Sequence, residues 1–218
     1  MECDAKNPVD LAITTALADP VASLAVTGPA VMSGATAHSA TVGPRRPIVL
    51  VGLMGAGKST VGRRLGLRLG LPFVDADAEI ERASGLSIAE IFERFGEAHF
   101  RDGERRVIAR LIGGPAKVVA TGGGAFIAAD TRALILERAI AIWLDADIAT
   151  LAERVRRRDT RPLLRDRDPA EVLTELARLR NPLYAEAHIH ISSKPTPHEA
   201  TVRAIVAALA DYPSAEPA

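Results

Sequence analysis

The residues best suited to chemistry form a glycine-rich segment close to the first strongly apolar run. Residues 52–60 read GLMGAGKST, which matches the phosphate-binding pattern G-x-x-x-x-G-K-[ST]. Glycines let successive backbone N–H groups point inward around an anion. Lys58 can then reach the β- and γ-phosphates, and the Ser59 hydroxyl can ligate Mg²⁺. The pattern predicts a nucleoside triphosphate site made by Gly55, Ala56, Gly57, Lys58, Ser59 and Thr60. The alternative, a glycine-rich turn without a ligand, has no use for the adjacent lysine and serine.

Two carboxylates follow a second apolar run, residues 73–74. They are Asp75 and Asp77, at the carboxyl end of a predicted strand, where an open α/β sheet binds its ligands. Residues two apart on a strand share a face, so both side chains can point toward the phosphates. We expect an acidic group there because phosphoryl transfer requires Mg²⁺. The alternative is that one of the two caps the helix that begins near Ala78.

A third set of glycines, residues 122–124, follows a predicted strand at residues 117–121 (KVVAT). Three glycines at the carboxyl end of a strand indicate either a tight turn or a close approach of the backbone to a ligand. The strand ends on the side of the sheet where ligands bind, so we favour the ligand.

Arginines supply the candidate anion-binding groups. Arg101 has Glu97 at i−4 and Glu104 at i+3, and acids so placed can hold a guanidinium in one orientation. Seven further arginines lie within residues 154–167, where Pro162 interrupts the helical period. This stretch predicts a mobile, positively charged lid over the phosphates. The alternatives are a surface loop without order or an RNA-binding patch.

Buried strands and amphipathic helices alternate around these residues, which is typical of an α/β fold with a parallel sheet. Strands are expected at residues 48–51, 73–74, 117–121, 139–144 and 188–191. Helices are expected after the glycine-rich segment, over 87–111 with a break near Gly96, from Asp130 or Thr131, over 147–158, from Pro169 and over 197–210. In the helix from Pro169, the residues expected to face the core are Val172, Leu173, Leu176 and Leu179.

Composition limits the function classes. Lys+Arg and Asp+Glu are balanced at 27 each, so no global charge points to nucleic acid or to a membrane surface. The single cysteine, Cys3, excludes an intrachain disulfide, and no apolar run is long enough to span a bilayer. Residues 1–43 contain no aromatic residue and no sustained period, so they are interpreted as a disordered extension before a domain at 44–212 and a tail at 213–218. A true start at Met32 is an alternative.

Taken in order, these segments resemble the shikimate kinase family over about residues 47–209. The resemblance rests on GLMGAGKST, on DAD at 75–77, on GEAHFRDGE at 96–104, on TGGGAF at 121–126, and on RPLL at 161–164 with RNPLY at 180–184. The first segment alone would fit many families, whereas the ordered set is specific. The resemblance implies a three-layer P-loop kinase fold, with a five-stranded parallel sheet of order 2-3-1-4-5, flanking helices and a mobile lid.

The family resemblance also implies ATP-dependent phosphorylation of the 3-hydroxyl of shikimate, on the route to chorismate. By this resemblance Asp77 holds the substrate hydroxyls and can take the proton of the attacking one, while Lys58 and Arg161 act on the transferred phosphoryl group. Ser59 and Asp75 act on Mg²⁺. Substrate contacts come from Arg101, Arg180 and the glycines Gly122, Gly123 and Gly124.

Other implications concern the nucleotide and the setting. Adenine is expected between Pro197 and a lid-base arginine, which could be any arginine within 154–158. The expected partners are ATP and shikimate, with no nucleic acid and no membrane. A cytoplasmic monomer is expected from the family.

Three rival functions fit parts of the sequence. A gluconate-kinase-like enzyme would share the glycine-rich segment and the lid, but it has no reason to carry the three glycines together with RNPLY. A neutral polyol or a nucleotide as acceptor would leave Arg101 and Arg180 without a carboxylate partner. A non-catalytic nucleotide-binding protein would be expected to lose at least one of the charged site residues. RNA binding through the arginine-rich stretch predicts strongly salt-dependent affinity and fits poorly with net neutrality.

Overall fold

The computed structural model describes residues 44–156, 168–193 and 198–213. Strands and helices alternate along the chain, as the sequence pattern predicts. The strands are β1 (Ile48–Val51), β2 (Phe73–Asp75), β3 (Val118–Ala120), β4 (Ile140–Asp145) and β5 (Ile189–Ser192). The helices are α2 (Lys58–Leu69), α3 (Ala76–Ser84), α4 (Ile88–Ile112), α5 (Ala129–Arg138), α6 (Ile148–Arg156), α7 (Pro169–Tyr184) and α8 (His198–Asp211).

The five strands form one parallel sheet of order β2-β3-β1-β4-β5, which confirms the predicted order. All four residues of the central strand β1 are buried, because this strand has a neighbour on each side and helices over each face. In the register of the sheet, Leu50 of β1 lies beside Ala120 of β3 and Ile142 of β4. The carboxyl ends of these strands therefore meet at one edge of the sheet.

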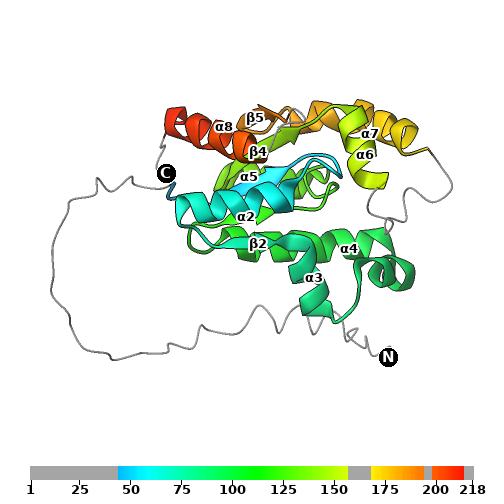
Figure 1. The fold of residues 1–218 in the computed structure, drawn as a ribbon. Helices are drawn as coiled ribbons and strands as arrows, with labels where there is room; N and C mark the ends of the chain where they lie inside the picture. Colours follow the sequence, from blue (N-terminus) through cyan, green and yellow to red (C-terminus); the bar gives the residue numbers. More distant parts are fainter. Residues whose placement is uncertain (1–43, 157–167, 194–197, 214–218) are drawn as a thin grey trace, which may run out of the picture.

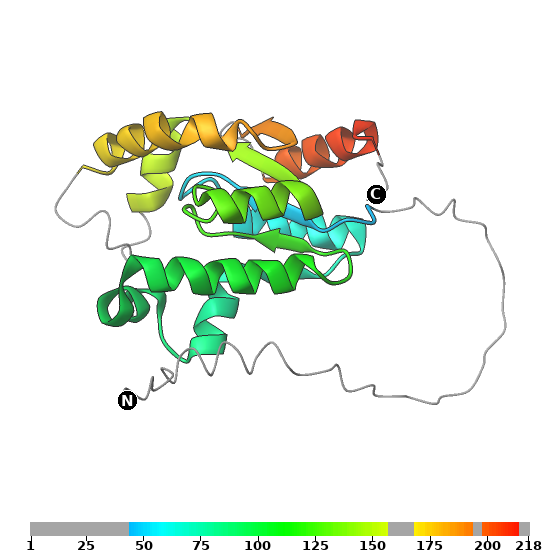
Figure 2. The same cartoon turned by 180° about the vertical axis from the view of Figure 1, so that it is seen from behind.

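Helices cover both faces of the sheet. Helices α2 and α8 pack against each other on one face, which is in front in Figure 1. Helices α4 and α5 pack on the opposite face, which is in front in Figure 2. Within the described residues, no helix is long and apolar enough to cross a membrane.

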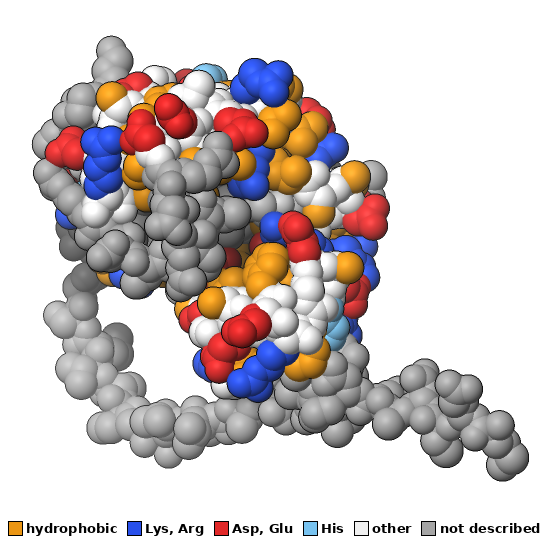
Figure 3. Space-filling model, turned by 90° about the vertical axis from the view of Figure 1, so that its right-hand side faces the viewer, with side chains coloured by type: hydrophobic (Ala, Val, Ile, Leu, Met, Phe, Trp, Pro, Cys, Tyr) orange, Lys and Arg blue, Asp and Glu red, His pale blue; other side chains and the backbone are white. Residues whose placement is uncertain are grey.

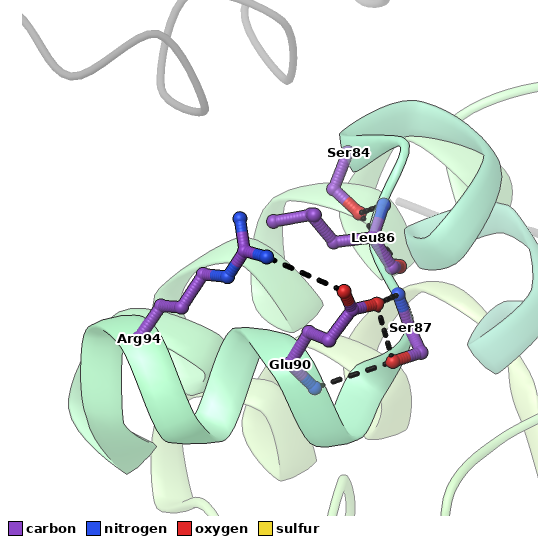
Figure 4. A network of polar contacts seen from close by, with 5 residues as sticks. All are labelled: Ser84, Leu86, Ser87, Glu90 and Arg94. Carbon is purple, nitrogen blue, oxygen red and sulfur yellow. Dashed lines mark hydrogen bonds and ion pairs between the residues drawn. The ribbon is translucent and has the colours of Figure 1, made fainter.

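Helix α4 combines a capped start with a break. Ser87 and Glu90 form the predicted capping box: the Ser87 hydroxyl accepts from the Glu90 backbone N–H at 3.3 Å, and the Glu90 carboxylate accepts from the Ser87 N–H at 2.9 Å (Figure 4). At Gly96 the backbone turns to φ 79° and ψ 174°, a conformation that glycine adopts without steric cost. The predicted break near Gly96 is therefore confirmed.

Three details of the prediction are wrong. Helix α3 begins at Ala76 and not near Ala78, so Asp77 lies in its first turn rather than on the strand with Asp75. Helix α5 begins at Ala129 after Ala128, before the predicted start at Asp130 or Thr131, and its N-cap makes no side-chain hydrogen bond that would mark it in the sequence. Leu179 is 56% exposed, although we expected it in the core. The buried face of α7 runs through Leu173 and Tyr184, and Leu179 is rotated about 120° from Leu173 at 3.6 residues per turn.

Candidate active site

The glycine-rich segment joins β1 to α2 at the carboxyl edge of the sheet. Gly57 is the N-cap of α2 and has φ 90°, so a side chain there would be strained. The Lys58 ammonium donates to the carbonyl oxygens of Gly52 at 2.8 Å and Leu53 at 2.9 Å and so bridges the loop. This places a cation inside a ring of backbone groups at the start of a helix, which is an arrangement suited to phosphate.

Asp75 caps α3 and also contacts the Ser59 hydroxyl. One of its oxygens, Oδ2, accepts from the Ser59 hydroxyl at 2.6 Å, and the other, Oδ1, accepts from the Asp77 N–H at 3.2 Å as the N-cap of α3. The hydroxyl and the carboxylate therefore face each other across the end of β2. Hard oxygen donors of this kind are the ligands that Mg²⁺ prefers, usually one or two from the protein with the rest from phosphates and water.

A cavity of about 410 Å³ opens beside the loop. One end is formed by Asp77, Gly122 and Gly123, and the other by Gly57, Arg154 and His198. Loop residues lie between the two ends. Within the described part of the chain, the lining residues are Gly55, Gly57, Lys58, Ser59, Thr60, Asp75, Asp77, Thr121, Gly122, Gly123, Arg154, Val155 and His198. Ala56 does not line the cavity; its N–H donates to the Leu53 carbonyl at 3.3 Å.

The three consecutive glycines lie close to three different charged side chains. A Cβ atom at Gly122 would lie 2.8 Å from Asp77 Oδ1, and one at Gly123 would lie 3.8 Å from Arg180 Nη1. At Gly124 it would lie 2.6 Å from Arg101 Nη1, closer than real Cβ contacts allow. Residues 122–124, called the glycine segment below, thus bring the predicted substrate-binding residues together. The two arginines lie just beyond the cavity.

Arg101 is held from two sides, as its sequence spacing predicts. Its guanidinium contacts Glu104 at 2.6 Å and Glu97 at 3.2 Å. The Glu104 side chain is almost fully buried, and this burial raises the pKa of the carboxyl; the charge of Arg101 opposes the rise, whereas Asp77 and Glu97 add to it. Burial lowers the pKa of Arg101, but the two ion pairs outweigh it and the net shift is upward. The guanidinium is therefore charged and fixed in orientation.

Arg180 and Tyr184 both act on the Gly123 carbonyl. The Arg180 guanidinium donates to it at 3.2 Å, and the Tyr184 hydroxyl donates to the same oxygen. Tyr184 is fully buried between Phe126 and Trp143, and burial raises the pKa of its hydroxyl to about 12, so the phenol stays protonated as a donor. Two residues one turn apart on α7 thus anchor the glycine segment.

Of the candidate arginines that the structure describes, Arg154 and Arg156, only Arg154 lines the cavity. Its guanidinium donates to the Gly55 carbonyl at 3.3 Å. Arg156 instead pairs with Asp168 at 2.9 Å, away from the lining residues. The predicted site residues Arg161 and Pro197, and the candidate arginines Arg157 and Arg158, lie outside the described residues, so their roles stay predictions.

Sequence reasoning missed Tyr184 and three residues that line the cavity, namely Thr121, Val155 and His198. Tyr184 was noticed only as part of RNPLY, and no spacing rule connects it to Gly123, 61 residues away. The position of His198 depends on how α8 packs against α2, which short-range patterns do not encode.

A phosphate-binding loop joins β1 to α2, with Lys58 at the start of the helix, and β2, two strands away from β1 in the sheet, ends in the carboxylate of Asp75. This combination defines a P-loop kinase of the small-molecule type. Comparison with known proteins identifies the family. A family model described as shikimate kinase matches residues 54–210. The chain belongs to the shikimate kinase family.

Individual relatives agree with this assignment. The chain is similar to a shikimate kinase of Caulobacter vibrioides, with 62% identity over 75% of this chain and 82% of the relative. It is also similar to a shikimate kinase of Rhodopseudomonas palustris, with 59% identity over 79% of this chain and 85% of the relative.

Solved structures give the same result at the level of the fold. A shikimate kinase from Acinetobacter baumannii in complex with shikimate superimposes with a TM-score of 0.73, at 39% identity, over 77% of this chain and 94% of that chain. A gluconokinase from Sinorhizobium meliloti has a TM-score of 0.53 at 21% identity, over 78% of this chain and 94% of that chain. The second likeness concerns the fold alone.

Proposed function

We propose that this chain transfers the γ-phosphoryl group of ATP to the 3-hydroxyl group of shikimate, giving shikimate 3-phosphate and ADP in the synthesis of chorismate and the aromatic amino acids. One observation carries the proposal. Arg101 and Arg180 approach neighbouring glycines beside Asp77, at the far end of a cavity that begins at the phosphate-binding loop. Two guanidinium groups and one carboxylate suit an acceptor with one carboxylate and several hydroxyl groups.

The two arginines would bind the carboxylate of shikimate. Each guanidinium can form a bidentate, charge-assisted pair with a carboxylate. Glu104 and Glu97 hold Arg101 in place before substrate arrives, so less side-chain entropy is lost on binding. The similar kinase from Acinetobacter baumannii was solved in complex with shikimate, and this supports the same ligand here.

Asp77 would hold the acceptor hydroxyl and take its proton. The acceptor oxygen forms a bond to the γ-phosphorus while the bond from that phosphorus to the β,γ-bridging oxygen breaks, and ADP leaves. The transition state is loose, so positioning and charge neutralisation contribute most of the rate. Lys58 supplies positive charge in the loop, and Arg161 in the predicted lid would supply more.

Ser59 and Asp75 would hold Mg²⁺, Ser59 directly and Asp75 through water. Their oxygens face each other at 2.6 Å beside the phosphate-binding loop, which fits this donor set. When bound, Mg²⁺ neutralises charge on the β- and γ-phosphates. The chain itself contributes the orientation of the hydroxyl, which Asp75 fixes by accepting its hydrogen bond.

The adenine ring would stack on Arg154, because this lid-base arginine lines the cavity at the end away from Asp77. Pro197 would contact the other face of the ring. The chain would act as a monomer in the cytoplasm, with ATP and shikimate as its partners.

Product analysis tests the reaction. The chain is incubated with ATP, Mg²⁺ and shikimate, and phosphorus and proton NMR locate the phosphate ester. We expect a single ester at the 3-hydroxyl. An ester at another hydroxyl, or free phosphate without ester, would refute the proposed reaction.

A substrate analogue tests the carboxylate contact. Shikimate methyl ester lacks the charge that Arg101 and Arg180 would bind, so wild-type kcat/KM should fall sharply with the ester. An Arg180→Met variant should lose most of this discrimination. Equal rates with acid and ester in the wild-type protein would contradict the two-arginine contact.

A further inference from the structure

His198 lines the cavity without any assigned role. It is the first residue of α8, and its imidazole lies beside the N-cap of α2. A Cβ atom at Gly57 would lie 3.6 Å from His198 Cε1, 3.8 Å from His198 Nδ1 and 3.9 Å from Arg154 Nη1. Two side chains from α8 and α6 thus meet at the same glycine of the phosphate-binding loop.

The cavity has a direction that places this imidazole relative to the nucleotide. The acceptor end is formed by Asp77, Gly122 and Gly123, and the γ-phosphate must point toward it for transfer to occur. Lys58 reaches the β- and γ-phosphates from the loop. The α-phosphate and the nucleoside must then lie toward Gly57, Arg154 and His198.

We propose that His198 is a nucleotide-binding residue whose imidazole donates a hydrogen bond to the α-phosphate of ATP. The inference rests on ATP binding in the phosphate-binding loop. It does not depend on Pro197, which lies outside the described residues. Arg154 lies on the same side of the loop, and its positive charge would also attract this phosphate.

The charges around the imidazole give the contact a pH dependence. Burial lowers the pKa of His198, and the charges of Arg154 from α6 and Arg64 from α2 lower it further. Lys58 adds another cation to the same cavity. The free protein therefore holds a neutral imidazole near neutral pH. A phosphate beside the ring favours the protonated form, so the pKa rises on binding. Between the two pKa values nucleotide binding takes up a proton, and affinity increases as pH falls.

Nucleotide binding is measured directly, because turnover would not separate this contact from the chemistry. Isothermal titration calorimetry with MgADP near pH 6.5 gives the Kd, and repetition in two buffers of different ionisation enthalpy gives the proton uptake. His198→Phe should raise Kd about tenfold, since it removes a hydrogen bond to a charged group. His198→Gln keeps an N–H donor, so it should lose less affinity but bind MgADP with less proton uptake than the wild-type protein.

The matched control is His190→Gln, which replaces a histidine outside the cavity by the same residue. His190 lies on β5, bonded to Asp145 at 3.1 Å and stacked on Trp143, and it does not line the cavity. This variant should match the wild-type protein in both measurements. An unchanged Kd in His198→Phe, or an unchanged proton uptake in His198→Gln, would overturn the proposal. Failure of the wild-type protein to bind MgADP would instead refute the proposed function.

Discussion

At the scale of single residues, the acceptor site requires glycines, which have no side chain, as much as it requires charged side chains. Gly124 lies so close to Arg101 that any Cβ atom would displace the guanidinium, whose neighbours Glu97 and Glu104 hold it in position. The guanidinium is the end of a flexible side chain, so it can move away without unfolding the protein.

Gly124→Ala should therefore fold normally but bind shikimate poorly. We expect KM for shikimate to rise about tenfold or more, as for a lost charge-assisted hydrogen bond, with KM for ATP unchanged. Steady-state kinetics with each substrate varied in turn measures both values. Equal increases in the two KM values would show that the substitution disturbs more than Arg101.

Glu104 should show the conflict between stability and function that is common at binding sites. Burial raises the pKa of its carboxyl above the ordinary value, so ionising it costs folding free energy as pH rises through the raised pKa. Glu104→Gln removes that cost. Denaturant unfolding near pH 5 and near pH 8 should show the variant gaining stability relative to wild type at the higher pH.

The same Glu104→Gln variant should bind shikimate more weakly, because Arg101 loses its 2.6 Å ionic partner. A relative stability that falls between the lower and the higher pH would contradict the assigned direction of the pKa shift. An unchanged KM for shikimate would show that Glu97 alone holds the guanidinium.

The sequence predicts local relations among residues well and distant ones poorly. Glu97, Arg101 and Glu104 were predicted together because helical spacing fixes their neighbourhood. The contact of Arg154 with Gly55, and that of Tyr184 with Gly123, depend on how separate elements pack. Short-range patterns carry no information on such packing.

At the scale of elements, helix α4 positions Arg101 in the site. Side chains stabilise the start of this helix. The capping box of Ser87 and Glu90 satisfies two backbone N–H groups, and Arg94 adds an ion pair to Glu90 at 3.4 Å (Figure 4). Gly96 then turns the chain so that the second part of α4 begins beside residues 122–124, where Arg101 meets Gly124.

Ser87→Ala should lower the free energy of unfolding by about 1 kcal/mol, the usual cost of losing an N-cap side chain. Arg94→Ala is the matched control on the same cap, and it should cost less because its ion pair is exposed. Denaturant unfolding of both variants measures the difference. A larger loss in Arg94→Ala would contradict the capping-box account.

The order of elements was predictable because strands and helices alternate and the strands are strongly apolar. The boundaries of the helices and strands were less predictable. Helix α5 starts at Ala129 without a side-chain cap, and Leu179 lies off the buried face of α7. The start of α5 lacks the side-chain cap that marks the starts of α3, α4 and α7.

At the scale of the whole molecule, charge is mixed rather than concentrated. On the face shown in Figure 3, basic and acidic side chains are interspersed, which agrees with equal totals of 27. The basic groups of functional interest are gathered around the cavity instead, where Lys58 and Arg154 line it and Arg101 and Arg180 lie beyond it.

Deletion of residues 1–43 should leave kcat and both KM values unchanged. The described site residues begin at the loop that follows β1, and the family match begins at residue 54. Arg46→Ala is the contrasting change: its guanidinium donates to the carbonyls of Glu137 at 2.6 Å and Ala139 at 3.1 Å, so its loss should lower thermal stability. Reduced activity in the deletion variant would contradict this prediction and would show that residues 1–43 contribute to function.

In the proposed reaction, ATP and shikimate bind in one cavity and Asp77 takes the proton of the acceptor hydroxyl. The most direct measurement is coupled ADP release with ATP, Mg²⁺ and one acceptor at a time, namely shikimate, quinate, gluconate or AMP, for the wild-type protein and for Asp77→Asn. We expect ADP release that depends on shikimate and that falls about a hundredfold or more in Asp77→Asn, while this variant keeps its fold. Release driven equally by gluconate, or a folded Asp77→Asn variant with the wild-type rate, would contradict the proposed reaction.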